Sequence, residues 1–282
     1  MACYYYEVIN ESENPILKNV DISIILMVEY SERFLCDPFI LNLSKKTIVQ
    51  CNKGFKTCNK PSSVNVTTSD ITHAYYTAFE YANEHNYNNI IVLEEDAEVL
   101  YYEKYHYKLV DDFISKDFKI FSFASRGIFS KKDDNFFYIK GKADFAQALI
   151  ISKNERQKLM AEIKKRNYTG HIDSDYMIDN VVVYKYPLIV QLFPETENFN
   201  NWGGDKNLHR FTIKLIGCDK NKDSWDVVYA NSNPYYDAYA LRTESFFLGP
   251  EVIGELWCKN IKTGHFSISL YFKELWKKGL KL

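Results

Sequence analysis

The sequence contains little glycine and proline, 11 and 7 of its 282 residues, and no low-complexity tract or internal repeat. Hydrophobic residues make up 46% of the chain and aromatic residues 16%. This composition excludes a disordered or fibrous chain, because such chains lack the apolar side chains needed for a core. We therefore expect a folded protein with one large domain, or a domain of about 200 residues with an appended piece.

Neither sign of charge is in excess. Lys and Arg number 35, Asp and Glu number 37, and the formal net charge is −2. A chain with this balance has no global field that recruits nucleic acid or an anionic membrane. We therefore expect no nucleic-acid partner, and any polyanionic ligand must be held by a local site.

Long apolar runs are also missing. No segment approaches the roughly 18 to 20 apolar residues that span a bilayer, and the N-terminus lacks a basic region followed by an apolar core. These absences predict a soluble, cytoplasmic protein with no transmembrane segment. The abundance of Asn, Lys, Ile and Tyr suggests an AT-rich genome, bacterial or viral.

The cysteines show no metal-binding pattern. None of the six forms a C-x-x-C pair, and Cys51 and Cys58 are too widely separated for a zinc knuckle. The sequence therefore predicts free thiols.

Short apolar runs alternate with amphipathic stretches over the first two thirds of the chain, which is typical of an α/β fold. The runs are apolar on both faces, so we expect a mainly parallel sheet covered by helices on both sides. Ser152 and Glu155 form a candidate capping box, and Ser69 or Asp70 marks another helix start. The expected strands are 21–28, 47–50, 89–93, 119–124, 148–152 and 181–193, and the expected helices are 72–86, 102–115 and 152–166.

The pattern changes near residue 205, after a polar loop with paired glycines. Residues 1–205 are predicted to form the main domain. Residues 206–282 show weaker periodicity and are predicted to form a C-terminal α+β accessory segment.

Three consecutive acids, Glu94, Glu95 and Asp96, follow the apolar run of residues 90–93. A parallel strand that ends there would place them at the carboxyl edge of the sheet, where open α/β folds bind ligands. Their oxygens suit Mg²⁺ or Mn²⁺, and such an ion could bridge to a diphosphate. The alternative interpretation is a solvated acidic turn.

The order of motifs resembles family 25 glycosyltransferases, the group of lipopolysaccharide and collagen galactosyltransferases. Thr72-His73 stands where that family has a Ser-His pair, and I-V-L-E-E-D-A at 91–97 resembles its L-E-D-D-A motif. G-K-A-D-F-A-Q-A-L-I-I-S at 141–152 resembles its glycine segment, and H-I-D-S-D at 171–175 its Asp motif. The resemblance covers residues 20–205. This sequence departs from the family by Glu95 in place of Asp and by extra residues within the glycine segment.

The resemblance implies a GT-A-like fold and an inverting transfer of sugar from a nucleotide-sugar donor, such as a UDP- or GDP-sugar, to a glycan or glycoprotein. It also implies a Mn²⁺ or Mg²⁺ ion with Asp96 as principal ligand and Glu94 as a second, direct or through water. Glu95 points to the opposite side of the strand and would orient the ribose or the sugar. Arg126 is a candidate phosphate contact or a solvent-facing side chain.

An inverting transfer needs a carboxylate beside the acceptor hydroxyl. Asp175 and Asp173 are the candidate bases, and Asp144 is the next one. The H-I-D-S-D string is also typical of a plain helix start, with Asp173 or Ser174 as the cap of a helix over residues 176–180, so both interpretations stay open. For His73, a substrate contact and ordinary packing are the two alternatives.

A second class of function remains open at this point. The missing second Asp at position 95 is compatible with a GT-A-fold protein that binds carbohydrate or acts as a scaffold without catalysis. Nucleotide-dependent binding would favour the enzyme, whereas sugar binding without nucleotide would favour the scaffold.

Overall fold

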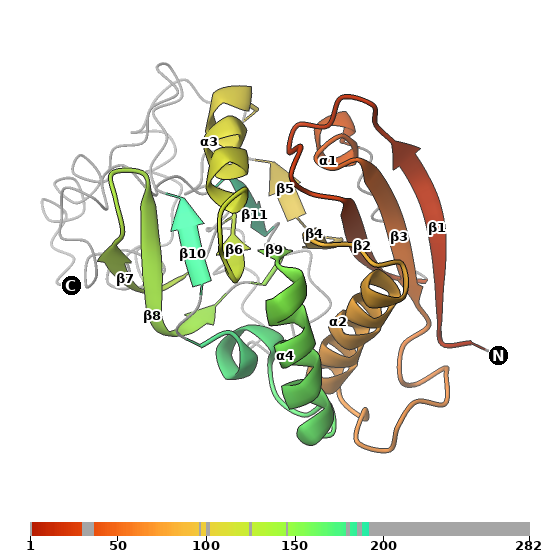
Figure 1. Ribbon diagram of the computed structural model, residues 1–282. Coiled ribbons are helices and arrows are strands. Elements are labelled where there is room, and N and C mark those ends of the chain that lie inside the picture. The colour runs from red at the N-terminus through yellow and green to blue at the C-terminus, as the bar shows by residue number, and fades with distance from the viewer. Residues whose placement is uncertain are drawn as a thin grey trace, which may run out of the picture.

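A computed structural model describes most of the first 191 residues (Figure 1). The expected boundary near residue 205 and the accessory segment 206–282 lie outside the described residues. The described ranges are 2–29, 37–95, 97–99, 102–123, 126–144, 146–178, 181–184 and 188–191.

Within the described residues, nine strands form one sheet and two short strands form a second. Figure 1 shows their arrangement. In the large sheet the spatial order is β1 (Tyr4–Glu11), β3 (Lys46–Asn52), β2 (Ile22–Val28), β4 (Ile90–Glu94), β9 (Ala148–Ile151), β6 (Ile120–Ser122), β10 (Val181–Tyr184), β8 (Phe136–Asp144) and β7 (Arg126–Lys131). The small sheet pairs β11 (Ile189–Gln191) with β5 (Ala97–Val99).

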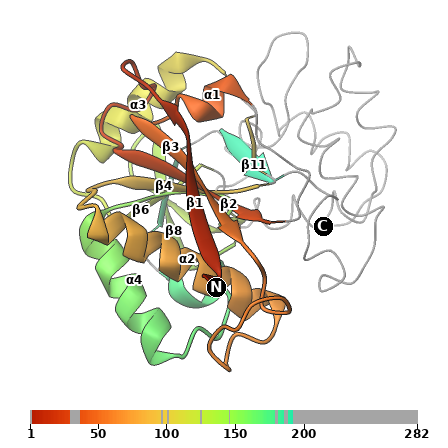
Figure 2. The same ribbon diagram turned by 90° about the vertical axis from the view of Figure 1, so that its right-hand side faces the viewer.

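Helices cover both faces of the large sheet (Figures 1 and 2). The helices α1 (Pro38–Leu41) and α3 (Lys104–Ile114) bury apolar side chains in the core on one face. The helices α2 (Thr67–Glu84) and α4 (Lys153–Lys165) do so on the other face, and a π-helical turn, η1 (Ile172–Tyr176), joins the same cluster. The predicted α/β class with two covered faces is therefore confirmed.

The prediction of a mainly parallel sheet is wrong, because the sheet is mixed. Of its eight neighbouring strand pairs, three are parallel, namely β2 with β3, β2 with β4, and β6 with β10. The central strand β9 runs antiparallel to both neighbours, and β7 and β8 form an antiparallel pair. An apolar run buried on both faces has the same composition in either direction, so the apolar pattern did not encode the direction of β9.

Side chains alternate between the two cores along the central strands. On β4, Ile90 and Val92 pack in the α2 and α4 layer, whereas Ile91 and Leu93 pack in the α1 and α3 layer. This period of two directs the next residue, Glu94, toward the α2 face. The strand therefore sets which side its terminal carboxylate occupies.

A buried arginine ties the start of α4 to the end of α2. The Arg156 side chain is fully buried, and its guanidinium donates to Asn83 Oδ1 (2.9 Å) and to the carbonyl of Tyr87 (2.6 Å). Ser152 is the N-cap residue of α4 but makes no side-chain cap bond, and Glu155 instead pairs with Lys158. The predicted capping box is therefore wrong, and α4 is anchored through Arg156.

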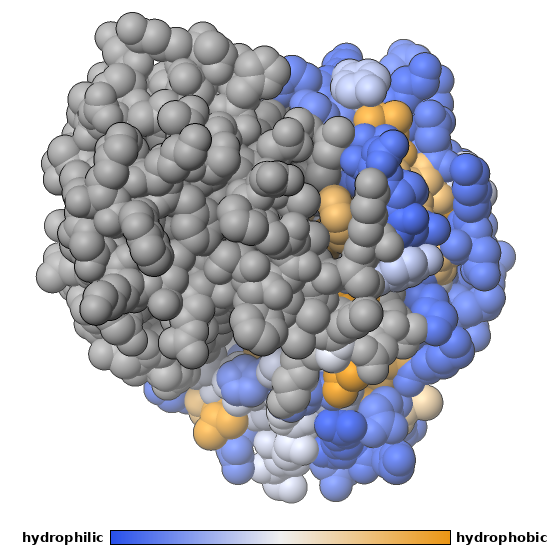
Figure 3. All heavy atoms as spheres, turned by 90° about the vertical axis from the view of Figure 1, so that its left-hand side faces the viewer, coloured by the Kyte–Doolittle hydropathy of each residue, from blue (hydrophilic) through white to orange (hydrophobic). Residues whose placement is uncertain are grey.

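The described surface visible in Figure 3 is mostly hydrophilic, with apolar residues scattered over it. Large apolar side chains that are exposed include Val8 on β1 and Tyr105 on α3. Among the described residues, no helix is both long and apolar enough to cross a membrane.

Candidate functional site

The candidate site lies where the strand order reverses. The chain passes from β2 to β3 on one side and then to β4 on the other side of β2. Both neighbours are parallel to β2, so the three carboxyl ends meet at one edge of the sheet. Open α/β sheets bind ligands in the crevice at such a point. Glu94 ends β4 at this edge, and Glu95 follows it.

Glu94 is held on the α2 side of the sheet by a buried tyrosine. The hydroxyl of Tyr75, a fully buried residue of α2, donates to the carbonyl of Ala146 (2.7 Å) and lies 3.3 Å from Glu94 Oε1. The backbone N–H of Glu94 donates to the carbonyl of Gln147 (2.8 Å). Tyr75 thus links α2, the end of β4 and the segment before β9, a role that sequence reasoning missed.

Glu95 turns toward the neighbouring strand. Its Oε2 accepts a hydrogen bond from the backbone N–H of Val28, the last residue of β2, at 3.2 Å. The carboxylates of Glu94 and Glu95 are thus held by different elements, α2 and β2. The side chain of Glu95 bridges the two strand ends between which the order reverses.

The metal assignment depends on a residue that the structure does not describe. Asp96, the predicted principal ligand, lies outside the described residues. Within the part of the chain that is described, no group of three or more His, Cys, Asp or Glu side chains is arranged to hold a metal ion. Carboxylate oxygens are suitable ligands for Mg²⁺ or Mn²⁺, and Glu94 lies next but one to Asp96 in the chain.

The predicted Asp motif is docked on the same helix. Thr72 Oγ1 donates to the carbonyl of Gly170 at 2.9 Å, one helical turn before Tyr75. Asp175 Oδ2 accepts from the backbone N–H of His171 (2.8 Å), and Asp173 Oδ1 accepts from that of Ser174 (2.7 Å). One stretch of α2 therefore contacts both the acidic strand end and the loop that carries the candidate bases.

The loop that carries the Asp motif has an unusual backbone. Gly170 has φ +96°, and a Cβ there would lie 3.0 Å from Asp175 Oδ2, so the position favours glycine. Asn167 and Tyr168 also adopt positive φ values, 51° and 62°, which are uncommon for residues with side chains. Such conformations persist where the surroundings over-determine them. Here the ring of Tyr168 packs edge-on against the ring of His73.

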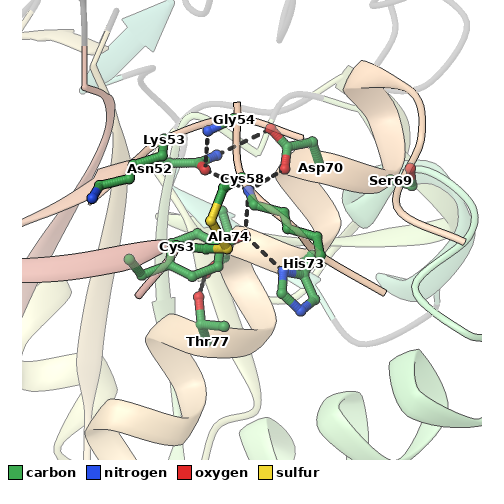
Figure 4. A network of polar contacts seen from close by, with 12 residues as sticks. Cys3, Asn52, Lys53, Gly54, Cys58, Ser69, Asp70, His73, Ala74 and Thr77 are labelled. Atoms are coloured by element: carbon green, nitrogen blue, oxygen red, sulfur yellow. Dashed lines mark hydrogen bonds and ion pairs between the residues drawn. A yellow bond between two sulfur atoms is a disulfide. The ribbon is translucent and has the colours of Figure 1, made fainter. Parts of the chain in front are cut away.

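A buried polar network lies beside the site, where β1 and β3 meet the start of α2 (Figure 4). The Lys60 side chain is 1% exposed and forms an ion pair with Asp70. Lys60 Nζ also donates to Asn52 Oδ1 (2.5 Å) and to the Tyr4 hydroxyl (2.9 Å). Burial lowers the pKa of the Lys60 ammonium, while Asp70 opposes that change.

His73 is part of this network. The contact of its Nδ1 agrees with ordinary packing, one of the two alternatives for this residue. Its Nδ1 lies 2.7 Å from the Tyr4 hydroxyl. Because the Lys60 ammonium can only donate, the Tyr4 hydroxyl accepts from Lys60 and gives its own proton to His73 Nδ1. This assigns the proton of neutral His73 to Nε2. Burial, and secondly the charge of Lys60, lower the pKa of His73 to about 4.

The lowered pKa of His73 predicts a loss of stability in acid. An unfolded histidine has a pKa near 6.5, so between pH 6.5 and 4 the unfolded chain binds more protons and folding weakens as the pH falls. One pKa unit corresponds to about 1.4 kcal/mol, which makes the loss about 3 kcal/mol. Urea denaturation of the wild type and His73→Gln at pH 7 and pH 4 measures it. An unchanged difference between the two proteins across this range would refute the assignment.

The cysteine prediction is wrong for two residues. Cys3 and Cys58 form a disulfide with a Cα–Cα distance of 5.6 Å, across a sequence separation of 55. Cys51 is free and buried, and the other three cysteines lie outside the described residues. The antiparallel pairing of β1 with β3 sets Tyr4 opposite Asn52 and so brings the two ends together. The spacing of these two cysteines in the sequence does not indicate that they pair.

Two further candidates lie at the edge of the sheet farthest from β1. Arg126 begins β7 and is paired in register with Asp144 on β8. The side chains of both residues lie outside the described part, so the expected phosphate contact of Arg126 stays a prediction.

Comparisons with known proteins assign neither a family nor a function to this chain. No protein-family model matches the sequence, and no curated protein matches it. Among solved structures, the crystal structure of A197 from STIV is similar over 58% of this chain and 81% of its own chain, with 12% sequence identity and a TM-score of 0.36.

Proposed function

We propose that this chain is a GT-A-type glycosyltransferase that moves a sugar from a nucleoside diphosphate, such as UDP or GDP, to a glycan or glycoprotein. The observation that carries the proposal is the position of Glu94 and Glu95 at the carboxyl end of β4, beside the reversal of strand order at β2. Carboxylates at this point of an α/β sheet lie where a nucleotide binds in related architectures. The resemblance of residues 20–205 to family 25 glycosyltransferases supports the same reading.

Divalent-metal dependence is part of the proposal. Asp96 would hold Mn²⁺ or Mg²⁺ as principal ligand, with Glu94 as a second ligand, direct or through water. The ion would stabilise the negative charge that develops on the leaving diphosphate. Glu95 has the role of orienting the ribose or the sugar, because its carboxylate is directed to the β2 side of the site.

The transfer itself needs a base on the acceptor side. The acceptor hydroxyl attacks the anomeric carbon from the face opposite the diphosphate, the bond from that carbon to the phosphate oxygen breaks, and Asp175 or Asp173 takes the hydroxyl proton. Support for this pair comes from α2, because Thr72 bonds to Gly170, just before the turn η1 that carries both aspartates, and Tyr75 bonds to the acidic strand end. In this scheme Tyr75 is a positioning residue.

A thermal-shift screen of the full chain tests the proposal. Nucleoside diphosphates with Mn²⁺ are expected to raise the Tm, because a ligand at 100 times its Kd adds about 2.7 kcal/mol of stability. The Asp96→Ala variant should lose the metal-dependent part of the shift. If no nucleoside diphosphate raises the Tm with or without metal, the proposal fails. A shift produced by free sugars alone would indicate the carbohydrate-binding scaffold instead.

A further inference from the structure

The segment 53–66 carries the buried Lys60 but contains no helix or strand. Its backbone hydrogen bonds are mostly internal, such as those from the N–H groups of Thr57 and Cys58 to the carbonyl of Gly54. Toward the rest of the protein, the N–H of Lys53 donates to the carbonyl of Cys3 at 3.1 Å. The N–H of Gly54 also donates to Asn52 Oδ1 (2.8 Å), and those of Asn65 and Val66 donate to Ser69 Oγ (3.2 and 3.3 Å). These backbone bonds therefore attach the segment at its two ends.

The Cys3–Cys58 disulfide attaches the middle of this segment to the rest of the protein. It joins the start of the outer strand β1 to the segment 53–66, two residues before Lys60 (Figure 4). Tyr4, the residue next to Cys3, contacts both Lys60 and His73. The disulfide thus links the two backbone segments that carry Tyr4 and Lys60, which belong to one polar network. A cross-link of this kind restricts the open states of the segment that it closes.

Both cysteines are accessible enough to exchange. Each is partly exposed, in contrast to the buried free thiol of Cys51. A dithiol reductant can therefore attack the disulfide, giving two protein thiols and the cyclic disulfide of the reagent. Oxidised glutathione reverses this step, and two molecules of glutathione are released as the protein disulfide forms.

We propose that Cys3–Cys58 is a redox-sensitive clamp that holds the segment 53–66, and with it Lys60, on the carboxyl edge of the sheet. In the oxidised state the disulfide holds the segment in place, so that its Lys60 stays buried in the ion pair with Asp70. In the dithiol state the polar contacts of Lys60, the buried side chain of Val64 and the backbone bonds at the two ends still hold the segment, but the covalent link is lost, so it opens more often. The inference does not depend on the proposed transferase activity.

Limited trypsin digestion of the full chain tests the clamp. The readout is cleavage after Lys53 and Lys56, with every sample acid-quenched and fully reduced before mass spectrometry, because the disulfide would otherwise keep cut fragments together. Protein equilibrated with oxidised glutathione is expected to resist cleavage. A dithiol should raise the initial rate at these two bonds by about tenfold or more, since cleavage follows the population of the open form. Cleavage after Lys132, an exposed residue in the turn between β7 and β8, is the internal control and should not change.

A paired variant shows whether the effect comes from this disulfide. Cys3→Ser/Cys58→Ser should be cut at the fast rate with and without the dithiol. Should that variant fail to fold, the wild type supplies the second measurement, because reoxidation with oxidised glutathione should restore protection. Equal cleavage rates in the oxidised and reduced wild type would overturn the proposal. Rapid alkylation of Cys3 and Cys58 after treatment with oxidised glutathione would also overturn it.

Discussion

Replacing Lys60 with methionine is expected to lower the free energy of unfolding by about 3 to 5 kcal/mol, because it breaks a buried ion pair and leaves one charge behind. The side chains of Lys60 and Asp70 are 1% and 11% exposed. Without the ammonium, the Asp70 carboxylate keeps the Asn52 amide as a donor, at 3.2 Å, but loses its counter-charge. Urea denaturation at neutral pH measures the change.

An exposed pair in the same protein supplies the matched control. Lys45 and Asp21 are 2.8 Å apart, but the Lys45 side chain is 53% exposed. Lys45→Met is therefore expected to change stability by no more than about 1 kcal/mol. Adding Asp70→Asn to Lys60→Met should recover part of the loss, since no buried charge then remains unpaired. If Lys60→Met costs no more than Lys45→Met, the buried network does not stabilise the fold as described.

Under the proposed transfer mechanism, replacing the candidate base with asparagine is expected to lower kcat by about 10² to 10⁴, with donor affinity nearly unchanged. The candidates are Asp175 and Asp173, and we expect Asp175 first. Asparagine keeps an oxygen that can accept the hydrogen bond that the His171 N–H now gives to Asp175. The loop should therefore keep its conformation while the basicity is lost. Steady-state kinetics with the true acceptor, beside Tm measurements of each variant, separate the two effects.

A purely structural role gives a different pattern. An asparagine oxygen can accept the backbone bonds that Asp175 and Asp173 now accept from His171 and Ser174, so both Tm and kcat would survive each change. If the two single variants and the double variant all turn over near the wild-type rate, the base is not in this motif. Asp144→Asn is then the next variant to measure.

The apolar strands and amphipathic helices were predictable because burial repeats along the sequence. The runs that became β2, β4 and β9 were found within two residues at each end, as were the helices α3 and α4. The start of α2 was placed too late, since the helix begins at Thr67 and Ser69 bonds back to the N–H of Val66. Edge strand β1 was missed, because its half-exposed pattern of tyrosines and polar residues has no continuous apolar run.

The contacts that define the site could not be predicted from the sequence. The acidic end of β4 was predicted from three adjacent acidic residues. Its partner Tyr75 lies 19 residues away on a helix, where a tyrosine usually indicates packing in the core. Lys60 lies in a polar stretch, where a lysine ordinarily indicates solvent exposure. Its burial depends on Tyr4 and Asp70, which only the pairing of β1 with β3 and the packing of α2 bring together.

Release of nucleoside diphosphate from a panel of nucleotide-sugars is the measurement that tests the central claim most directly. The full chain with Mn²⁺ should hydrolyse one donor slowly in the absence of acceptor, and the rate should fall to background with a chelator or in Asp96→Ala. Activity that survives both treatments would contradict the metal role of Asp96. The absence of nucleoside diphosphate release from every donor, by a protein whose Tm shows it to be folded, would contradict the assignment as a glycosyltransferase.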